Sequence, residues 1–364
     1  MSGAYSDVVD LASGQIVEPL SPAVRAAFDK ALDSDRTSAY APAYGDPDLR
    51  TAVADHYAVR TGTPVDPEHI TVTAGARHGL LVALSTVAHG GEVLVPRPHW
   101  SHYPAVVRRA GAQPVMVDGG ARDGWRVGPA ELEAARTERT RALLLNSPVN
   151  PTGAVYDAPR VRALRQWASA HGICLITDDI YWAYGDAVDR GVRASAHEIV
   201  VGGASKVYAL AGLRVGWVWG PPELSAALRD AVEYTTGPVC GTSQLAAAAA
   251  VRDTHAVAAR VDGLAARREA AVRIMTGIPL LEPVAPAGGI YLCLDATEAL
   301  SRQPHGARDD VALCRVLAEQ AGVRLRAGST FGMPGHLRLC VAEEADTLAE
   351  AARRLSDFLT TFNN

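Results

Sequence analysis

Short apolar runs alternate with longer amphipathic segments between residues 70 and 220. The runs predict buried strands at ITVTA (70–74), EVLVP (92–96), PVMV (114–117), ALLLN (142–146), ICLIT (173–177), EIVVGG (198–203) and VGWVWG (215–220). The segments between most of them predict helices at 77–88, 102–110, 157–171 and 222–233. Strands that alternate with helices indicate a largely parallel sheet covered by helices on both faces.

The pattern changes beyond this region. The last two runs lie close together, so one strand is expected to run antiparallel. An alanine-rich helical region at 242–275 and a proline- and glycine-rich connection at 279–289 follow. The remaining pattern predicts strands at 290–295, 323–327 and 336–342 and helices at 308–321 and 345–361. We therefore predict an α/β fold: a large domain with a mostly parallel mixed sheet flanked by helices, plus a small α+β domain.

Three units are expected along the chain of 364 residues. Residues 1–45 are predicted to form an N-terminal arm that packs with the small domain. Residues 46–280 are predicted to form the large domain, and residues 281–364 the small C-terminal domain.

The bulk composition excludes several classes of protein. The net charge of −5 gives no general attraction for nucleic acid, and no apolar run reaches transmembrane length. Five scattered cysteines without a C-x-x-C pair favour free thiols in a reducing cytoplasm over disulfides or a zinc cluster. His99 and His102 form an H-x-x-H pair without a suitably spaced third ligand, so no metal site is expected. We expect a cytoplasmic protein that binds neither nucleic acid nor membrane.

Lysine is nearly absent from the chain. Only Lys30 and Lys206 accompany thirty-three arginines. Arginine can replace lysine in most surface roles, but it stays protonated and cannot act as an amine nucleophile. Lys30 lies in a polar amphipathic segment, whereas Lys206 lies in the apolar, glycine-rich VVGGASKVYALAGLRVGW. The contrast indicates a Schiff-base lysine at position 206.

Polar residues of unusual type follow several of the predicted strands, where open α/β sheets bind ligands. They occur in GARHG after the first strand, in SPVNPTG with Asn150, in DDIYWAY with Asp178, Asp179 and Tyr181, and in ASK with Lys206. Arg214 follows eight residues after the lysine. An amine, an anion site, a carboxylate and a cation together suit pyridoxal 5'-phosphate, which needs each of them.

The chain is similar, over essentially its whole length, to the fold-type I aminotransferases of the aspartate aminotransferase superfamily (class I/II). The matching stretches are SAYAPAYGDPDLR, VTAGARHGLLVAL, GGEVLVPRPHW, NSPVNPTG, TDDIYWAY, SKVYALAGLRVGW and RAGSTFGMPGHLRL. The resemblance implies a homodimer with shared active sites, in which pyridoxal 5'-phosphate is held by a lysine.

The resemblance also assigns roles to individual residues. Lys206 would form the Schiff base and move the proton, Asp178 would pair with the ring nitrogen, and Tyr181 and Asn150 would contact the ring hydroxyl. The remaining cofactor contacts would be Trp100 on the ring face, Gly75, Ala76, Arg77, Ser205 and Arg214 at the phosphate, and Tyr40 reaching the phosphate of the partner chain. Arg338 would clamp the substrate α-carboxylate, with Gly14 of the arm and Asn150 lining the substrate site.

Some alternatives remain open on the residues alone. Asp179 competes with Asp178 for the ring nitrogen, and Arg338 could instead pair with Glu343 or Glu344 at the surface. Gly203 stands where many family members carry a hydroxyl that binds the phosphate, so another group would have to replace that contact.

The resulting functional hypothesis is ping-pong transamination between an L-amino acid and a 2-keto acid. The main alternative keeps the cofactor but makes the protein a lyase, decarboxylase or cyclase of specialised metabolism. A cofactor-binding transcriptional regulator is disfavoured because the arm before Tyr40 has no room for a helix-turn-helix. A nicotinamide dehydrogenase is disfavoured because no G-x-G-x-x-G follows the first strand. The identity of the amino acid is not indicated.

Overall fold

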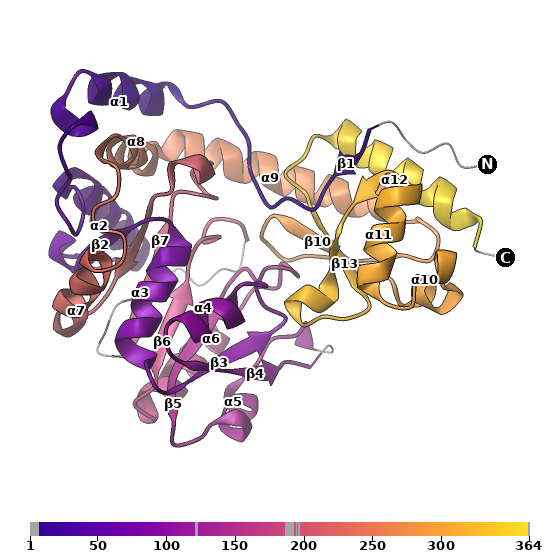
Figure 1. The fold of residues 1–364 in the computed structure, drawn as a ribbon, viewed down its shortest axis with the longest axis horizontal. Coiled ribbons are helices and arrows are strands. Elements are labelled where there is room, and N and C mark those ends of the chain that lie inside the picture. The colour runs from indigo at the N-terminus through magenta and orange to yellow at the C-terminus, as the bar shows by residue number, and fades with distance from the viewer. Residues whose placement is uncertain (1–6, 121–122, 186–192, 194, 196, 363–364) are drawn as a thin grey trace.

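The computed structural model describes residues 7–120, 123–185, 193, 195 and 197–362 (Figure 1). Its largest sheet has seven strands in the order β2-β8-β7-β6-β5-β3-β4. In chain order these strands are β2 (Ile70–Thr73), β3 (Glu92–Arg97), β4 (Gln113–Asp118), β5 (Thr140–Asn146), β6 (Cys174–Asp178), β7 (Glu198–Gly203) and β8 (Gly216–Trp219). Each coincides with a predicted apolar run to within two residues, and the mixed α/β class is confirmed.

Strand β8 is the expected antiparallel strand. It pairs antiparallel with both β2 and β7, while the other neighbours in the sheet pair parallel. Strand β2 therefore points the same way as β7. As a result, the carboxyl ends of six strands and the beginning of β8 lie along one edge of the sheet, where ligands bind in this class of fold.

Helices cover both faces of this sheet, which explains why its strands read as continuous apolar runs. On β5, Ala142 and Leu144 pack with one layer, while Leu143 and Leu145 pack with the other. The first layer contains α3 (Ala76–Ala88), α4 (Tyr103–Arg109) and α7 (Pro222–Glu233). On the other face lie α2 (Pro47–Thr61), α5 (Pro129–Ala135) and α6 (Ala158–Ala170).

The predicted helical region at 242–275 is two helices rather than one. Helices α8 (Gly241–Arg252) and α9 (Thr254–Met275) are separated at Asp253, whose carboxylate accepts a hydrogen bond from the amide of Ala256 (3.0 Å). This cap satisfies an amide that a continuous helix would have bonded internally, so the chain restarts in a new helix. Figure 1 shows α9 running from the large sheet to the C-terminal part of the molecule.

A second, four-stranded sheet is built from the C-terminal residues in the antiparallel order β12-β13-β10-β9. Its strands are β9 (Glu282–Val284), β10 (Tyr291–Asp295), β12 (Arg326–Ala327) and β13 (His336–Cys340). It is accompanied by α10 (Thr297–Arg302), α11 (Asp310–Gln320) and α12 (Ala345–Thr360). The connection expected at 279–289 therefore contains a strand, because Pro283 and its neighbours extend along the free edge of β10.

The strand expected over 323–327 is wrong as a single element. Residues Val323–Arg324 form β11, which pairs parallel with β1 (Val9–Asp10) of the N-terminal arm, while β12 joins β13. From β1 the arm crosses to α1 (Pro22–Leu32), which lies against α8 beside the large sheet (Figure 1). The arm thus joins the C-terminal part of the molecule through β1 and the helices beside the large sheet through α1. The domain bounds at residues 45 and 280 stay predictions. No helix in the described part of the chain is long and apolar enough to cross a membrane.

Candidate active site

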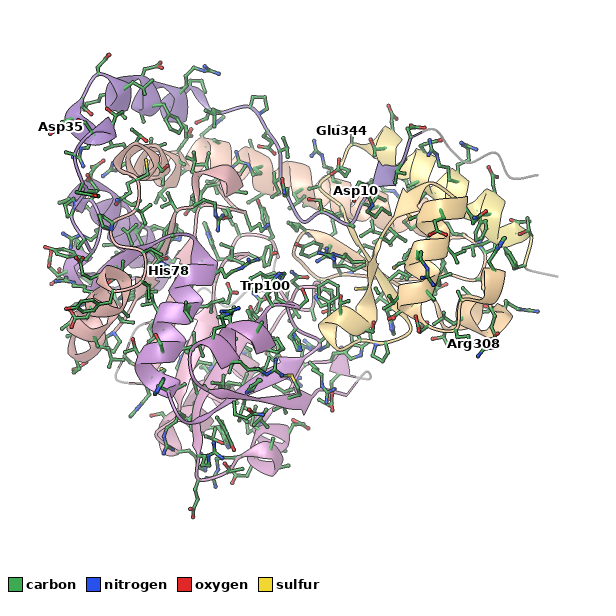
Figure 2. All side chains as sticks on the ribbon, in the orientation of Figure 1. Asp10, Asp35, His78, Trp100, Arg308 and Glu344 are labelled. Carbon is green, nitrogen blue, oxygen red and sulfur yellow. The ribbon has the colours of Figure 1, made fainter. Side chains whose placement is uncertain are left out.

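A cavity of about 630 Å³ opens at the carboxyl edge of the large sheet. Its walls come from residues 12–15 of the arm, the segments after β3, β5, β6 and β7, the start of α3, and strands β10, β12 and β13. Trp100, which lines it, lies between the large sheet and the C-terminal part of the molecule (Figure 2). Of the residues predicted for the site, those lining this cavity are Gly14, Ala76, Arg77, Trp100, Asn150, Asp178, Tyr181, Ser205, Lys206, Arg214 and Arg338.

Two predicted residues do not line the cavity. Gly75 lies just before Ala76 and contributes backbone only. Tyr40 is 95% exposed and lies outside the cavity of its own chain, so its predicted contact with a partner's phosphate stays a prediction.

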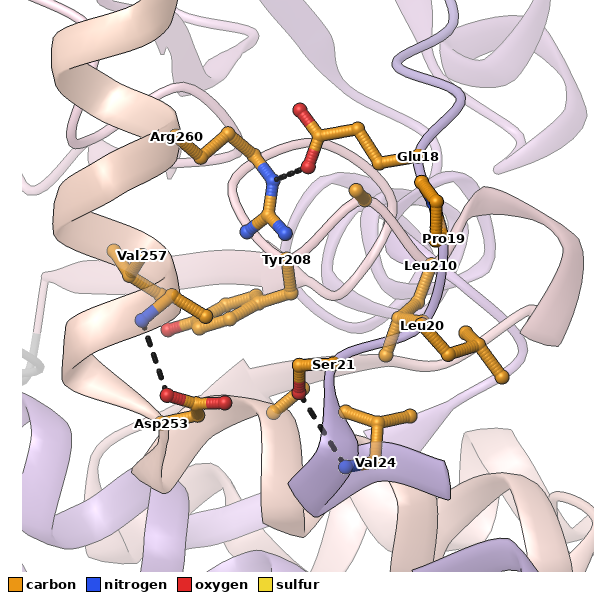
Figure 3. A pocket seen from close by; sticks show the side chains of 13 residues that line it. Glu18, Pro19, Leu20, Ser21, Val24, Tyr208, Leu210, Asp253, Val257 and Arg260 are labelled. Carbon is orange, nitrogen blue, oxygen red and sulfur yellow. Dashed lines mark hydrogen bonds and ion pairs between the residues drawn. The ribbon is translucent and has the colours of Figure 1, made fainter.

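A smaller hollow, where the arm crosses α9, offers no comparable chemistry (Figure 3). Arg260 is its cationic residue, and its guanidinium already contacts the carboxylate of Glu18 (2.8 Å) and the carbonyl of Val207 (2.8 Å). The charge of Arg260 is already paired, and the hollow has a volume of only about 20 Å³. Its residues therefore serve to pack the arm against α9.

Lys206 follows β7 and projects a partly buried amine into the large cavity. Burial lowers the pKa of Lys206, and the guanidinium groups of Arg338 and Arg214 lower it further. Its Nζ donates a hydrogen bond to the carbonyl of Gly14. A side chain at position 14 would collide with the hydroxyl of Tyr291, which explains the glycine. The arm therefore closes directly over the lysine, and the lowered pKa favours a neutral, nucleophilic amine.

Asp178 ends β6, the strand that pairs with β7, and lines the same cavity as Lys206. Burial raises its pKa to about 6, although a 2.6 Å hydrogen bond donated by the Tyr103 hydroxyl favours the ionised form. The amide of Ile180 donates a second, longer hydrogen bond of 3.3 Å to the same carboxylate. A buried carboxylate held by a hydroxyl is ready to pair with a cationic group in the cavity.

Asp179 lies in different surroundings. Its carboxylate contacts the guanidinium of Arg60, with a separation of 3.1 Å between Nη2 and Oδ1, and accepts a hydrogen bond from Tyr57 (3.4 Å). Arg60 comes from α2, behind the sheet, and the pair is buried. Of the two adjacent carboxylates, only Asp178 lines the cavity.

The start of α3 has the features of an anion site. Gly75 adopts φ +83° and supplies no side chain to cap the helix, so the first amide groups of α3 stay available. The guanidinium of Arg214 lies so close that a Cβ at position 75 would collide with it. Arg214 itself adopts the left-handed conformation (φ 56°) and has no acidic partner among the described residues. A helix N-terminus facing an uncompensated guanidinium strongly favours a bound anion.

Gly203 belongs to β7 rather than to the cavity lining. A Cβ there would lie 3.2 Å from the carbonyl of Val215 on the neighbouring chain segment. A hydroxyl side chain at this position would have to push against β8, so the close approach of the two segments explains the glycine.

Arg338 occupies the end of the cavity that the small sheet provides. It is 5% exposed and donates hydrogen bonds to the side-chain oxygen of Asn150 (3.2 Å) and to the carbonyl of Ala12 (2.7 Å). The rings of Tyr291 and Phe331 lie 4.1 and 4.7 Å from its guanidinium carbon.

No described residue forms an ion pair with Arg338, so its pairing with Glu343 or Glu344 is wrong. Glu344 instead pairs with Arg267 at 2.6 Å. A buried guanidinium without a carboxylate partner is costly to maintain, which indicates that Arg338 receives a carboxylate from a ligand.

Sequence reasoning missed two tyrosines of the site. Tyr103 supports Asp178, and Tyr291 bonds the hydroxyl of Tyr181 (3.3 Å) while its ring covers Arg338. Tyr103 begins α4 and its ring contacts that of Trp100, with centres 5.5 Å apart. Its nearness in the sequence to a predicted cofactor residue was a usable signal. Tyr291 lies in an apolar strand and carries no local motif.

Comparison with known proteins decides the family. Residues 6–355 match the family described as aminotransferase class I and II. The chain belongs to this family. An aspartate aminotransferase of Streptomyces avermitilis is 34% identical over 371 residues, covering 99% of this chain and 91% of that protein.

Solved structures of the family agree with the fold. A double mutant of Thermus thermophilus aspartate aminotransferase superposes with a TM-score of 0.89 at 33% identity, covering 97% of this chain and 92% of that one. The aromatic aminotransferase of Pyrococcus horikoshii gives 0.89 at 28% identity, covering 98% and 96%. This aminotransferase assignment is favoured over the elimination, decarboxylation or cyclisation considered as the alternative.

Proposed function

We propose that this aminotransferase binds pyridoxal 5'-phosphate in the large cavity, held covalently by Lys206, and moves an amino group between an L-amino acid and a 2-keto acid. The observation that carries the proposal is the position of Lys206. Its partly buried amine lies in one cavity with an anion site at α3 and with a buried arginine that lacks a carboxylate. An aldehyde-binding amine, a phosphate site and a carboxylate site are what such a reaction requires.

The donor set of the cavity fits this cofactor. The amides of Ala76 and Arg77 at the start of α3, together with Ser205 and Arg214, suit a phosphate dianion. Asp178 suits the ring nitrogen, because a cation beside it would offset the burial that raises its pKa. Tyr181 and Asn150 would contact the ring hydroxyl, and Trp100 would cover one face of the ring.

Each of these residues has a task that its surroundings support. When bound, the cofactor supplies the electron sink that makes the substrate Cα proton removable. Lys206, whose lowered pKa favours the neutral amine, can take that proton and return it. Arg338 can hold the substrate α-carboxylate through two parallel hydrogen bonds. Asp178 holds a negative charge beside the ring while the proton moves.

The proposal includes a homodimer in which Tyr40 of each chain reaches the partner's phosphate. The 95% exposure of Tyr40 and the exposed apolar side chains of Leu32 and Tyr234 are consistent with a surface that a second copy covers. Relatives are named for aspartate and for aromatic amino acids, so family membership alone does not select a substrate. Residence in the cytoplasm stays a prediction.

Lys206→Ala tests the proposal, with Lys30→Ala as its matched control, because the chain has only these two lysines. Purified protein is loaded with pyridoxal phosphate, reduced with borohydride, digested and analysed by mass spectrometry. We expect the cofactor mass on the peptide containing Lys206 in the wild type and in Lys30→Ala. Lys206→Ala should carry no label and should lose nearly all transamination, which typically means a loss of several orders of magnitude.

A label on Lys30, or visible cofactor absorbance that survives in Lys206→Ala, would contradict the assignment. In that case a group other than Lys206 would have to bind the cofactor covalently, whichever amino acids the wild type transaminates. The outcome that most clearly contradicts the assignment is equal cofactor labelling of Lys206→Ala and Lys30→Ala.

A further inference from the structure

One ion pair joins the two ends of the segment that carries Tyr40. Arg36 belongs to a short helical turn, η1 (Asp35–Thr37), and Asp46 caps the start of α2. The guanidinium of Arg36 contacts the carboxylate of Asp46. The pair therefore closes a loop of residues 37–45, the Tyr40 loop, with Tyr40 near its middle.

Backbone hydrogen bonds fasten both ends of the Tyr40 loop as well. The amide of Asp46 donates one of 2.7 Å to the side chain of Gln244, a fully buried residue of α8. At the other end, the carbonyl of Asp35 accepts one of 2.8 Å from the amide of Ala39. The loop thus has fixed ends on either side of Tyr40.

Tyr40 itself is not held by its own chain. Its side chain is 95% exposed, and it makes no hydrogen bond to the residues that the structure describes. Figure 2 shows Asp35, which precedes the loop, at the outer edge of the molecule and away from Trp100 of the cavity. Tyrosine suits contacts between molecules, because its ring packs on a partner while its hydroxyl forms a hydrogen bond. The loop therefore presents Tyr40 outward, away from the cavity of its own chain.

The charge of Asp46 is explained by Arg36 and not by the helix that Asp46 caps. One carboxylate oxygen accepts a hydrogen bond from the amide of Asp48 (2.9 Å), which caps α2, and the other faces Arg36. Asparagine or serine would cap a helix about as well without a charge. Asp46 is 1% exposed, and a buried carboxylate is costly unless a cation compensates it. The ion pair is thus a separate feature of this position.

We infer that the ion pair between Arg36 and Asp46 positions Tyr40 for the cofactor phosphate of the partner chain. The inference rests on the proposed function, in which Tyr40 acts across the dimer. A flexible loop would lose conformational entropy on contact with the partner. A loop that is fixed beforehand avoids this loss, so it binds more tightly. Arg36 and Asp46 are therefore positioning residues for a site in the other chain.

The test opens this ion pair without uncapping α2. Arg36→Met removes the guanidinium, and Asp46→Asn keeps a capping side chain while removing a charge that would otherwise stay buried and unpaired. The matched control opens another arginine–aspartate pair at α2, by combining Arg252→Met with Asp48→Asn. That pair joins α8 to α2 at 2.7 Å and lies outside the Tyr40 loop.

Hybrid dimers, selected with two affinity tags, show on which chain the ion pair acts. In the first hybrid, the opened pair and Lys206→Ala are in one chain, beside a wild-type chain. The only lysine-bearing site then receives Tyr40 from the variant chain. In the second hybrid, the opened pair is in the chain that keeps Lys206, and its partner carries only Lys206→Ala. The Kd of pyridoxal phosphate at the lysine-bearing site is measured by Schiff-base absorbance.

The Kd of the first hybrid should rise about threefold to tenfold, because affinity falls with the fraction of time that Tyr40 is in place. The rise should not exceed that caused by Tyr40→Ala, which removes the contact altogether. The second hybrid should titrate like a hybrid of wild type and Lys206→Ala, and so should both hybrids with the control pair. In the cofactor-free dimer, opening the pair should also speed hydrogen exchange of the Tyr40 loop.

An unchanged Kd in the first hybrid, in a protein that Tyr40→Ala weakens, would overturn the inference and leave the shared site intact. Equal weakening of both hybrids would also overturn it, because the ion pair would then act on its own chain. If Tyr40→Ala leaves the Kd unchanged, the proposed sharing of sites fails instead. Should the opened pair prevent dimers from forming, Arg36→Lys replaces it, since lysine keeps the charge without the fork. A smaller rise, confined to the first hybrid, is then expected.

Discussion

Asp178 and Asp179 follow one another in the chain but meet opposite conditions. Asp179 is buried against Arg60, which compensates its charge. Asp178 is buried in the cavity wall with hydrogen-bond donors from Tyr103 and Ile180, and no cationic group of the described residues contacts it. Burial therefore raises the pKa of Asp178 to about 6. In the cofactor-free protein the ionised carboxylate is therefore destabilised by burial, and a cation placed beside it would stabilise it.

This cost predicts how the cofactor-free protein responds to pH. The carboxyl of Asp178 titrates near pH 4 when unfolded and near pH 6 when folded, so the folded state binds more protons between these values. Stability should therefore fall as pH rises from about 4 to about 6. Asp178→Asn removes this titration, so its free energy of unfolding should gain about 3 kcal/mol relative to the wild type across that window. Urea unfolding of both cofactor-free proteins measures the difference.

Comparing the two proteins isolates Asp178, since all other titrating groups are shared. The difference between them should be small at pH 4 and constant above pH 6. If the two stability curves run parallel from pH 4 to pH 7, Asp178 does not carry the raised pKa described here.

At the scale of elements, the strands of the large sheet could be predicted because central strands buried on both faces are continuously apolar. Helix α2 could not be recognised by periodicity, since its buried residues include Arg50 as well as Leu49 and Tyr57. Its start was nevertheless visible in the sequence: Asp46 caps the helix and Pro47 occupies its first turn. The break at Asp253 carries the same kind of signal, a capping aspartate, but it stands within an alanine-rich region that reads as one helix.

The residues of the site also differ in whether the sequence could predict them. Residues that follow strands, such as Asp178 and Lys206, could be predicted because strand ends share one edge of a sheet. Tyr291 and Arg326, which also line the cavity, could not, because their positions depend on the pairing of short strands in the second sheet. Shifting β12 by one residue against β13 would turn Arg326 to the other face, and no local pattern specifies that register.

The N-terminus of α3 offers a test of how an element holds the cofactor. Gly75→Ala places a methyl group against Arg214 and forces alanine into a backbone conformation (φ +83°, ψ 165°) that only glycine adopts easily. We expect the dissociation constant of pyridoxal phosphate to rise about tenfold or more, because the amides of α3 and the guanidinium of Arg214 must separate. Fluorescence titration with the cofactor measures this change.

Gly62→Ala is the matched control for that variant. Gly62 ends α2 at φ 68°, and a methyl group there meets no atom within 4 Å. The substitution should cost about 1 kcal/mol of stability through its left-handed backbone and leave cofactor affinity unchanged. Equal losses of affinity in both variants would indicate a general effect of backbone strain rather than an anion site at α3.

At the scale of the whole molecule, the arm connects the parts that form the cavity. The carbonyl of Ala12 accepts a hydrogen bond from Arg338, and that of Gly14 accepts one from Lys206. Nearby, the carbonyl of Leu11 accepts a hydrogen bond from the amide of Cys340 in β13 (2.9 Å). The arm continues to α1 and the exposed Tyr40, beside the large sheet. One segment therefore links the lysine, the carboxylate site and the surface proposed to meet a partner chain.

This arrangement makes the proposed sharing of sites testable with a hybrid dimer. One chain carries Tyr40→Ala, the other carries Lys206→Ala, and two different affinity tags select the mixed species. If Tyr40 acts across the interface, the site of the first chain combines its own Lys206 with Tyr40 from the partner, so it is intact.

Tyr40→Ala homodimers should bind pyridoxal phosphate about tenfold more weakly than the wild type, because a hydrogen bond to a charged group is lost. The hybrid should instead show one wild-type site per dimer, measured by cofactor titration and by half of the wild-type activity. If Tyr40 acted within its own chain, the only lysine-bearing site of the hybrid would keep the weakened affinity, and a hybrid that titrates like the Tyr40→Ala homodimer would rule out shared sites.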